Sequence, residues 1–139
     1  MLTENYIRES TRRTPGVMLT PGKIVITGRS IPDNPGEFFS PLLEKIIDQV
    51  SEFSGITQID LGFEYINTTS AKWIFLILKK ISGMVDVAQK ASVTWYYEQG
   101  DDDMCELGFI MHSVIECAFL VSETGRMDDA FYRRLRSSE

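Results

Sequence analysis

Residues 61–78 have the sequence LGFEYINTTSAKWIFLIL, and the rest of the chain is organised around them. Up to Ile66 the pattern is typical of the end of a buried strand, and from Ala71 it is typical of an apolar-striped helix. Between the two lie Asn67 and three consecutive hydroxyl residues. The first N–H groups of a helix lack intrahelical partners and lie at the positive end of its dipole. The sequence therefore predicts a turn that is suited to a phosphate or another anion.

The segments around this turn alternate between strand and helix patterns. Residues 20–23 are predicted to form a type II turn with Gly22 at the position that needs positive φ. Residues 17–19 and 23–28 should therefore pair as a hairpin. Further strands are predicted at 57–61, 93–97 and 117–121, the last at an edge. The helices between them are predicted over 38–53, from the turn to about Ala88, and over 104–114.

The start of the first helix shows the residues of a capping box. Asn34 is the predicted N-cap, Pro35 suits the first helical position, and Glu37 follows three residues after Asn34. Pro41 lies inside the pattern and lacks a backbone donor. It is expected to kink the first turns or to restart the helix from Ser40.

This order of elements predicts the fold class. Helical connections between strands imply parallel pairing with right-handed crossovers. We expect a single α/β domain over residues 14–122, with a mixed, mostly parallel sheet of four to five strands and about three helices. Residues 1–13 are predicted to be a flexible lead-in. Residues 123–139 form either a short peripheral helix, with Met127, Phe131 and Leu135 at helical spacing, or a frayed end.

Composition and charge exclude several classes of protein. The net charge of −6 argues against binding to nucleic acid, which requires a basic surface. No apolar run is long enough to span a membrane, and the charged N-terminus predicts no secretion signal. Cys105 and Cys117 are too few for a disulfide framework or a zinc site, so we expect a cytoplasmic protein.

The hydroxyl cluster at residues 68–70 has two interpretations. The first is helix capping alone, since Thr and Ser are ordinary N-cap residues. The second is a phosphorylation switch, because the helix dipole would favour a phosphate there while a partner that covers the site would be repelled. Trp73 and Leu76 lie off the main apolar stripe of the helix. They are either part of the core or exposed anchors for a partner, and we favour the anchors, because Trp is favoured at interface hot spots.

Two other groups of residues invite a chemical interpretation. Residues 101–103 are three aspartates that, with Glu98 and Glu106, could bind a divalent cation, but they also suit the start of a helix, which we favour. His112 is the single histidine, and its spacing from Cys105 and Cys117 does not suit a catalytic dyad. We therefore expect no catalytic residue, no metal and no cofactor.

Several stretches together resemble the SiaC-type regulatory phosphoproteins, which are bacterial proteins with a STAS-like fold related to anti-sigma-factor antagonists. The stretch that resembles the family most specifically is Asp60-Leu61 leading into residues 65–72. The resemblance extends over about residues 14–122. Its other parts are Thr14-Pro15 with Val17, residues 28–34 with Glu37 and Phe38-Phe39, residues 93–97 with the acidic run, and Ala118-Phe119.

The resemblance implies a switch protein that is not an enzyme. By position Thr68 is the phosphoacceptor, modified by a cognate Ser/Thr kinase and dephosphorylated by a PP2C-type phosphatase. Thr69 stands where the family often has Ser and is the alternative candidate for the acceptor. The unphosphorylated form would bind an output partner such as a diguanylate cyclase and promote biofilm formation. A STAS-like module that holds a nucleotide, lipid or other anion at the same turn is the alternative. The predicted partner-binding residues are Tyr65, Asn67, Ser70, Lys72, Trp73 and Leu76.

Overall fold

The computed structural model describes residues 5–84 and 91–137 of the 139-residue chain. Within these ranges there are six strands and four helices. The strands are β1 (Tyr6–Arg8), β2 (Gly16–Thr20), β3 (Lys23–Ser30), β4 (Thr57–Ile66), β5 (Ala91–Glu98) and β6 (Ala118–Thr124). The helices are α1 (Pro35–Glu52), α2 (Thr68–Ser82), α3 (Asp102–Val114) and α4 (Asp129–Arg136).

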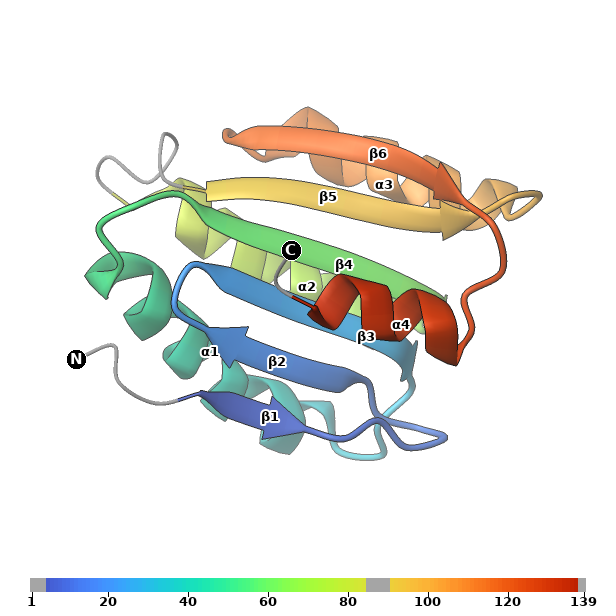
Figure 1. The fold of residues 1–139 in the computed structure, drawn as a ribbon, viewed down its shortest axis with the longest axis horizontal. Helices are drawn as coiled ribbons and strands as arrows, with labels where there is room; N and C mark the ends of the chain where they lie inside the picture. Colours follow the sequence, from blue (N-terminus) through green and yellow to red (C-terminus); the bar gives the residue numbers. More distant parts are fainter. Residues whose placement is uncertain (1–4, 85–90, 138–139) are drawn as a thin grey trace.

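The six strands form one sheet in sequence order (Figure 1). β1, β2 and β3 pair antiparallel, whereas β3, β4, β5 and β6 pair parallel. Each parallel pair is joined through a helix, and right-handed crossovers between adjacent strands place successive helices on the same face. Figure 1 shows α1, α2 and α3 together behind the sheet and α4 in front of it. The predicted class, an α/β domain with a mostly parallel sheet, is confirmed. The described residues form six strands and four helices, whereas the sequence predicted four to five strands and about three helices.

The main core lies between the sheet and the layer formed by α1, α2 and α3. Alternate strand residues point into it, as expected for a sheet covered on this face. Trp95 of β5 is fully buried there, and its indole N–H donates to the carbonyl of Met104 at 3.0 Å. Gly108 allows α3 to approach this ring, since a Cβ at that position would lie 2.5 Å from Trp95 Cδ1. The largest fully buried side chains also include Phe39, Phe63, Ile74, Leu78 and Ile81.

A second, smaller core covers part of the opposite face of the sheet. Met127, Phe131 and Leu135 pack there against Met18 and Val25. α4 is therefore a docked amphipathic helix, so the helical alternative for the C-terminal segment is the one that the structure shows. The Phe131 ring meets Tyr96 edge-on at 5.4 Å, and its Cε2 would lie 3.3 Å from a Cβ at Gly62.

Residues 6–8 form an edge strand within the segment that the sequence predicts to be a flexible lead-in. Tyr6 pairs with Leu19, and Arg8 pairs with Val17. The strand is largely exposed, so it lacks the apolar alternation by which a strand is found in a sequence. Two side chains nevertheless anchor it on α1: the guanidinium of Arg8 lies 4.6 Å from the centre of the Phe38 ring, and Lys45 Nζ lies 4.9 Å from that of Tyr6.

The ends of two helices also differ from the predictions. Asn34 is the N-cap of α1, but its side chain makes no capping hydrogen bond, so the predicted capping box is wrong. Pro35 does occupy the first turn, and Pro41 lies inside one continuous helix rather than at a restart. α2 ends at Ser82 rather than near Ala88, since Gly83 takes the C-cap position and glycine is a poor helix former. Ala88 itself lies outside the described residues.

Replacing Phe131 by alanine tests how firmly α4 is docked. Phe131→Ala should lower the free energy of unfolding by about 3 kcal/mol, because it empties the centre of the second core. The matched control is Arg133→Ala on the exposed side of the same helix, which should change the value by less than about 0.5 kcal/mol. Urea unfolding followed by circular dichroism measures both. Equal stabilities of the two variants would show that α4 contributes nothing to the fold.

Candidate functional site

A single residue, Asn67, connects β4 to α2 and fixes the helix start. Its N–H donates to the carbonyl of Ser30 at 3.1 Å, which ties the turn to the end of β3. Its side-chain Oδ1 accepts a hydrogen bond from the N–H of Ser70 at 2.8 Å, and its carbonyl accepts one from Ala71 at 2.9 Å. Asn67 therefore acts as a true N-cap. The sequence predicted a turn over residues 67–70 before the helix, but the structure begins α2 at Thr68, so the three hydroxyl residues form the first turn of the helix.

The three hydroxyl residues after Asn67 lie in different environments. Ser70 is completely buried, and its Oγ accepts a hydrogen bond from Ser30 Oγ at 2.8 Å. Thr68 and Thr69 are exposed. The Ser70 hydroxyl thus holds α2 against β3 and is closed to an enzyme. The hydroxyls within reach of a modifying enzyme are those of Thr68 and Thr69.

The exposed start of α2 is electropositive. The first four N–H groups of a helix have no intrahelical acceptor. In α2, the N–H of Asn67 donates to the Ser30 carbonyl and that of Ser70 donates to Asn67 Oδ1. The N–H groups of Thr68 and Thr69 are left to bind an anion or solvent. The first turn of α2 has no acidic residue, whereas the first turns of α1, α3 and α4 each contain Asp or Glu. Lys72 lies exposed one turn further on. A negative group on Thr68 would therefore meet an unneutralised helix dipole.

Apolar side chains are exposed close to this helix start. Tyr65 is 48% exposed at the end of β4, and the Arg29 guanidinium lies 5.7 Å from the centre of its ring. Phe75 and Leu76 of α2 are 37% and 40% exposed. Leu76 was singled out in the sequence, but Phe75 was not, although it also lies off the stripe of buried residues. Exposed apolar groups beside a modifiable hydroxyl are what a docking surface requires.

Trp73 is half-buried between the core and the exposed surface of α2. Its ring stacks on Phe39 of α1 with centroids 5.9 Å apart and an interplanar angle of 12°. It is half-buried and packs against the main core, so it joins α2 to α1. A partner on this surface would touch only its exposed edge.

The residues considered for catalysis or metal binding are used structurally. Asp101 Oδ1 accepts a hydrogen bond from the N–H of Met104, which confirms that the acidic run caps α3. The His112 ring stacks on Phe119 with centroids 5.4 Å apart. Burial raises the pKa of the Cys117 thiol, which is the wrong direction for a nucleophile. Within residues 5–84 and 91–137, no three His, Cys, Asp or Glu side chains are grouped so that they could hold a metal ion.

Asp60 is the buried carboxylate of the sheet, and it lies away from the helix start. Burial raises its pKa, against smaller opposing effects from Gln58, which donates a hydrogen bond of 2.8 Å, and from Lys23 at 3.8 Å. It pairs in register with Val25 of the second core. These contacts identify Asp60 as part of the sheet interior.

In the described part of the chain no helix combines the length and apolar character that crossing a bilayer requires.

A double-mutant cycle on Ser30 and Ser70 tests the anchor of α2. Ser70→Ala should lower the free energy of unfolding by about 1–3 kcal/mol, because it leaves the buried Ser30 hydroxyl without a partner. Ser30→Ala should act similarly, and the double variant should cost less than the sum of the two. Thr69→Ala, at an exposed neighbouring hydroxyl, is the control and should cost less than about 0.5 kcal/mol. Strict additivity in urea unfolding would argue against the hydrogen bond.

The chain matches one protein-family model and several solved structures. Residues 8–123 match the model described as SiaC family regulatory phosphoprotein. This range contains the β4–α2 turn and ends before α4. Among curated proteins, the uncharacterized protein PA14_02130 of Pseudomonas aeruginosa (strain UCBPP-PA14) is 25% identical over 101 residues. The alignment covers 67% of this chain and 80% of the relative.

Two solved structures establish the fold independently. SiaC of Pseudomonas aeruginosa superposes with a TM-score of 0.77 at 19% identity, covering 88% of this chain and 100% of that one. A second match is in a crystal structure of the diguanylate cyclase SiaD in complex with its activator SiaC from the same organism. It has a TM-score of 0.76 at 20% identity and covers 86% of this chain and 99% of that one. The fold of this domain is therefore shared with these proteins.

Proposed function

Because this chain belongs to the SiaC family of regulatory phosphoproteins, we propose that it is a phosphorylation-controlled switch protein and not an enzyme. Thr68 is the proposed phosphoacceptor, and Thr69 is the second candidate. A Ser/Thr kinase adds the phosphate and a PP2C-type phosphatase removes it. We place the protein in the cytoplasm, where the kinase finds its ATP.

The observation that carries this proposal is the contrast between the hydroxyls at the start of α2. Ser70 is buried and bonded to Ser30, whereas Thr68 is exposed at the first helical position. A phosphate at Thr68 would lie at the positive end of a helix that has no acidic residue in its first turn. Such an anion is stabilised by about 0.3–1 kcal/mol at an exposed helix start. The domain should therefore accept the modification without unfolding.

The consequence of phosphorylation falls on a partner. In the proposal, the output protein covers the helix start and contacts Tyr65, Lys72 and the exposed parts of Trp73 and Leu76, while Asn67 and Ser70 hold the surface in place. A phosphate adds a charge of about −1.5 to −2 at neutral pH. Burying that charge without a partner costs several kcal/mol, and each ~1.4 kcal/mol is tenfold in affinity. Phosphorylation should thus release the output protein.

A diguanylate cyclase is the proposed output protein. The support is the solved complex in which SiaC of Pseudomonas aeruginosa is the activator of the cyclase SiaD. By analogy, the unphosphorylated form of the present chain would bind and activate a cyclase of its own bacterium, promoting cyclic-di-GMP signalling and biofilm formation. This step rests on the likeness of fold and on membership of the family.

A second candidate function is reversible binding of a small anion at the same end of the sheet. It is favoured by a surface pocket of about 540 Å³ beside the end of β3, lined by Arg12, Arg13, Arg29 and Ile31. Arg13 is paired with Asp33, but Arg29 makes its hydrogen bond to the backbone carbonyl of Arg12. A nucleotide or lipid phosphate retained by the purified protein, together with unchanged partner binding by Thr68→Asp, would favour this function over the switch.

Phosphate mapping tests the acceptor directly. Incubation of the purified protein with its cognate kinase and ATP should add one phosphate, which tandem mass spectrometry should locate on Thr68. Thr68→Ala should incorporate much less phosphate, because the exposed hydroxyl that is left in the cluster belongs to Thr69, our second candidate for the acceptor. Thr69→Ala is the matched control one position along the same helix and should be modified like the wild type. Incorporation confined to Thr69 or Ser70, or none at all, would contradict the assignment.

A further inference from the structure

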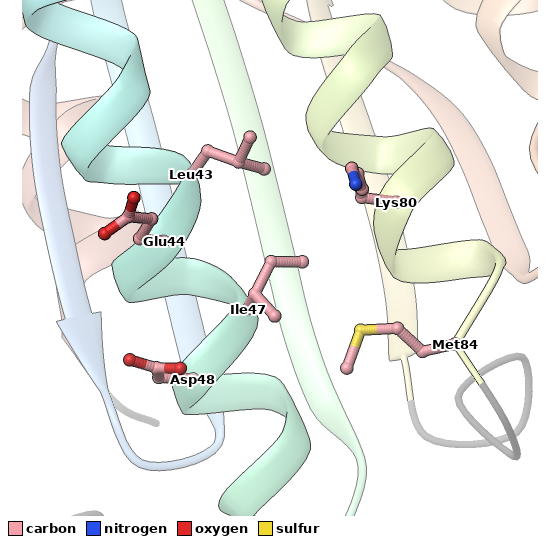
Figure 2. A pocket seen from close by; sticks show the side chains of 6 residues that line it. All are labelled: Leu43, Glu44, Ile47, Asp48, Lys80 and Met84. Carbon is pink, nitrogen blue, oxygen red and sulfur yellow. The ribbon is translucent and has the colours of Figure 1, made fainter.

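A groove runs between α1 and α2 near the C-terminal end of α2. It lies away from the β4–α2 turn that contains Thr68, which we call the switch turn. It has a volume of about 540 Å³ and is lined by the six residues labelled in Figure 2. Leu43 and Ile47 point from α1 toward α2, and Met84, just beyond the end of α2, points back toward Ile47. All three are half-buried, so the floor of the groove is apolar and partly open to solvent.

The two sides of the groove carry opposite charges. Glu44 and Asp48 are exposed on α1 and lie one helical turn apart. Lys80 is exposed on α2, on the other side. In the part of the chain that the structure describes, none of these three charges has an ion-pair partner. The groove thus offers an apolar floor, an acidic flank and a single basic group opposite.

The wall of α2 that lines the groove continues to the switch turn. Thr69, Trp73, Leu76 and Lys80 are spaced by three or four residues, so they share one side of the helix. Thr68 and Lys80 are separated by twelve residues, or about 18 Å at 1.5 Å per residue. A helix of about three turns could therefore lie in the groove and reach the edge of Trp73, one turn from the phosphoacceptor.

We propose that the α1–α2 groove binds an amphipathic helix of the output protein. Its apolar stripe packs on Leu43, Ile47 and Met84. Basic residues one turn apart face Glu44 and Asp48, and an acidic residue on its other side faces Lys80. Apolar anchors at helical spacing with complementary flanks are the usual mode by which a helix lies in a groove.

Photo-crosslinking in the producing cells tests the occupant. The photoreactive residue p-benzoylphenylalanine replaces Leu43 in one variant and the exposed Lys80 in another, which guards against misfolding of the first. A third variant carries it at Leu120, which is 60% exposed on β6, as the control site. The two groove positions should crosslink to one segment, whose peptide sequence shows an apolar helical stripe flanked by Lys or Arg at i and i+4. The Leu120 variant should not label that segment.

Charge reversal distinguishes a specific groove contact from mere proximity. In the Leu43 crosslinking protein, Glu44→Lys with Asp48→Lys should lower the yield at least tenfold, since close interfacial charge pairs contribute about 1.5 kcal/mol or more. Glu106→Lys with Glu116→Lys makes the same change in net charge at exposed sites elsewhere and should leave the yield within about twofold. No crosslink from either groove position, a crosslinked segment without the stripe, or equal effects of the two charge reversals would overturn the proposal.

The groove proposal rests on the proposed function, because that function identifies the protein that supplies the helix. Different results would nevertheless contradict the groove proposal and the proposed function. If the charge reversals in the groove leave cyclase activation intact while phosphorylation of Thr68 abolishes it, the groove proposal fails and the switch stands. If the groove crosslinks to a matching helix from a protein that is not a cyclase, the cyclase assignment fails and the groove proposal stands.

Discussion

The site depends on the hydrogen bonds of Asn67. Through one residue, the chain passes from the end of β4 into α2, and Asn67 bonds at the same time to Ser30 of β3 and to the N–H groups of Ser70 and Ala71. The buried Ser30–Ser70 hydrogen bond adds a second link between the same two elements. These contacts leave Thr68 and Thr69 exposed on a rigid helix start. The geometry of the proposed switch is thus set by side chains that a phosphate on Thr68 would not disturb.

The arrangement of layers limits where a partner can bind. The helices α1, α2 and α3 cover one face of the sheet, and α4 closes part of the other through Phe131 and Leu135. The exposed apolar side chains Phe75 and Leu76 and the α1–α2 groove all lie in the helix layer, which also contains the start of α2. α4 lies beyond the residues that match the family model, and it packs on the face of the sheet opposite this surface.

The sequence predicted most of this fold because its buried elements carry clear periodicity. The parallel strands, their connecting helices and the β4–α2 turn follow from apolar patterns that burial imposes. The errors lie where burial is partial. β1 is a short exposed edge strand whose order comes from pairing with β2, and no local pattern reports that. The C-terminal segment had helical spacing, but docking depends on the distant residues Met18, Val25 and Tyr96.

The two N-cap asparagines show that contacts between distant residues also limit what the sequence predicts at the candidate site. Asn34 and Asn67 are both N-cap asparagines before a helix, yet only the side chain of Asn67 caps its helix. Likewise, three adjacent hydroxyls are equivalent in the sequence, and they differ in the structure because Ser70 meets Ser30, forty residues away in the chain. Contacts of this range are set by the assembled sheet. They are what reduces a cluster of three hydroxyls to two accessible ones.

The central claim is that a phosphate on Thr68 controls partner binding without altering the fold. Isothermal titration calorimetry with the proposed diguanylate cyclase partner should compare the unmodified protein with the form singly phosphorylated on Thr68. Urea unfolding should be measured on both forms. We expect affinity to fall about a hundredfold or more, and the free energy of unfolding to change by less than about 1 kcal/mol. Equal affinities of the two forms, or a loss of binding that accompanies unfolding, would contradict the account.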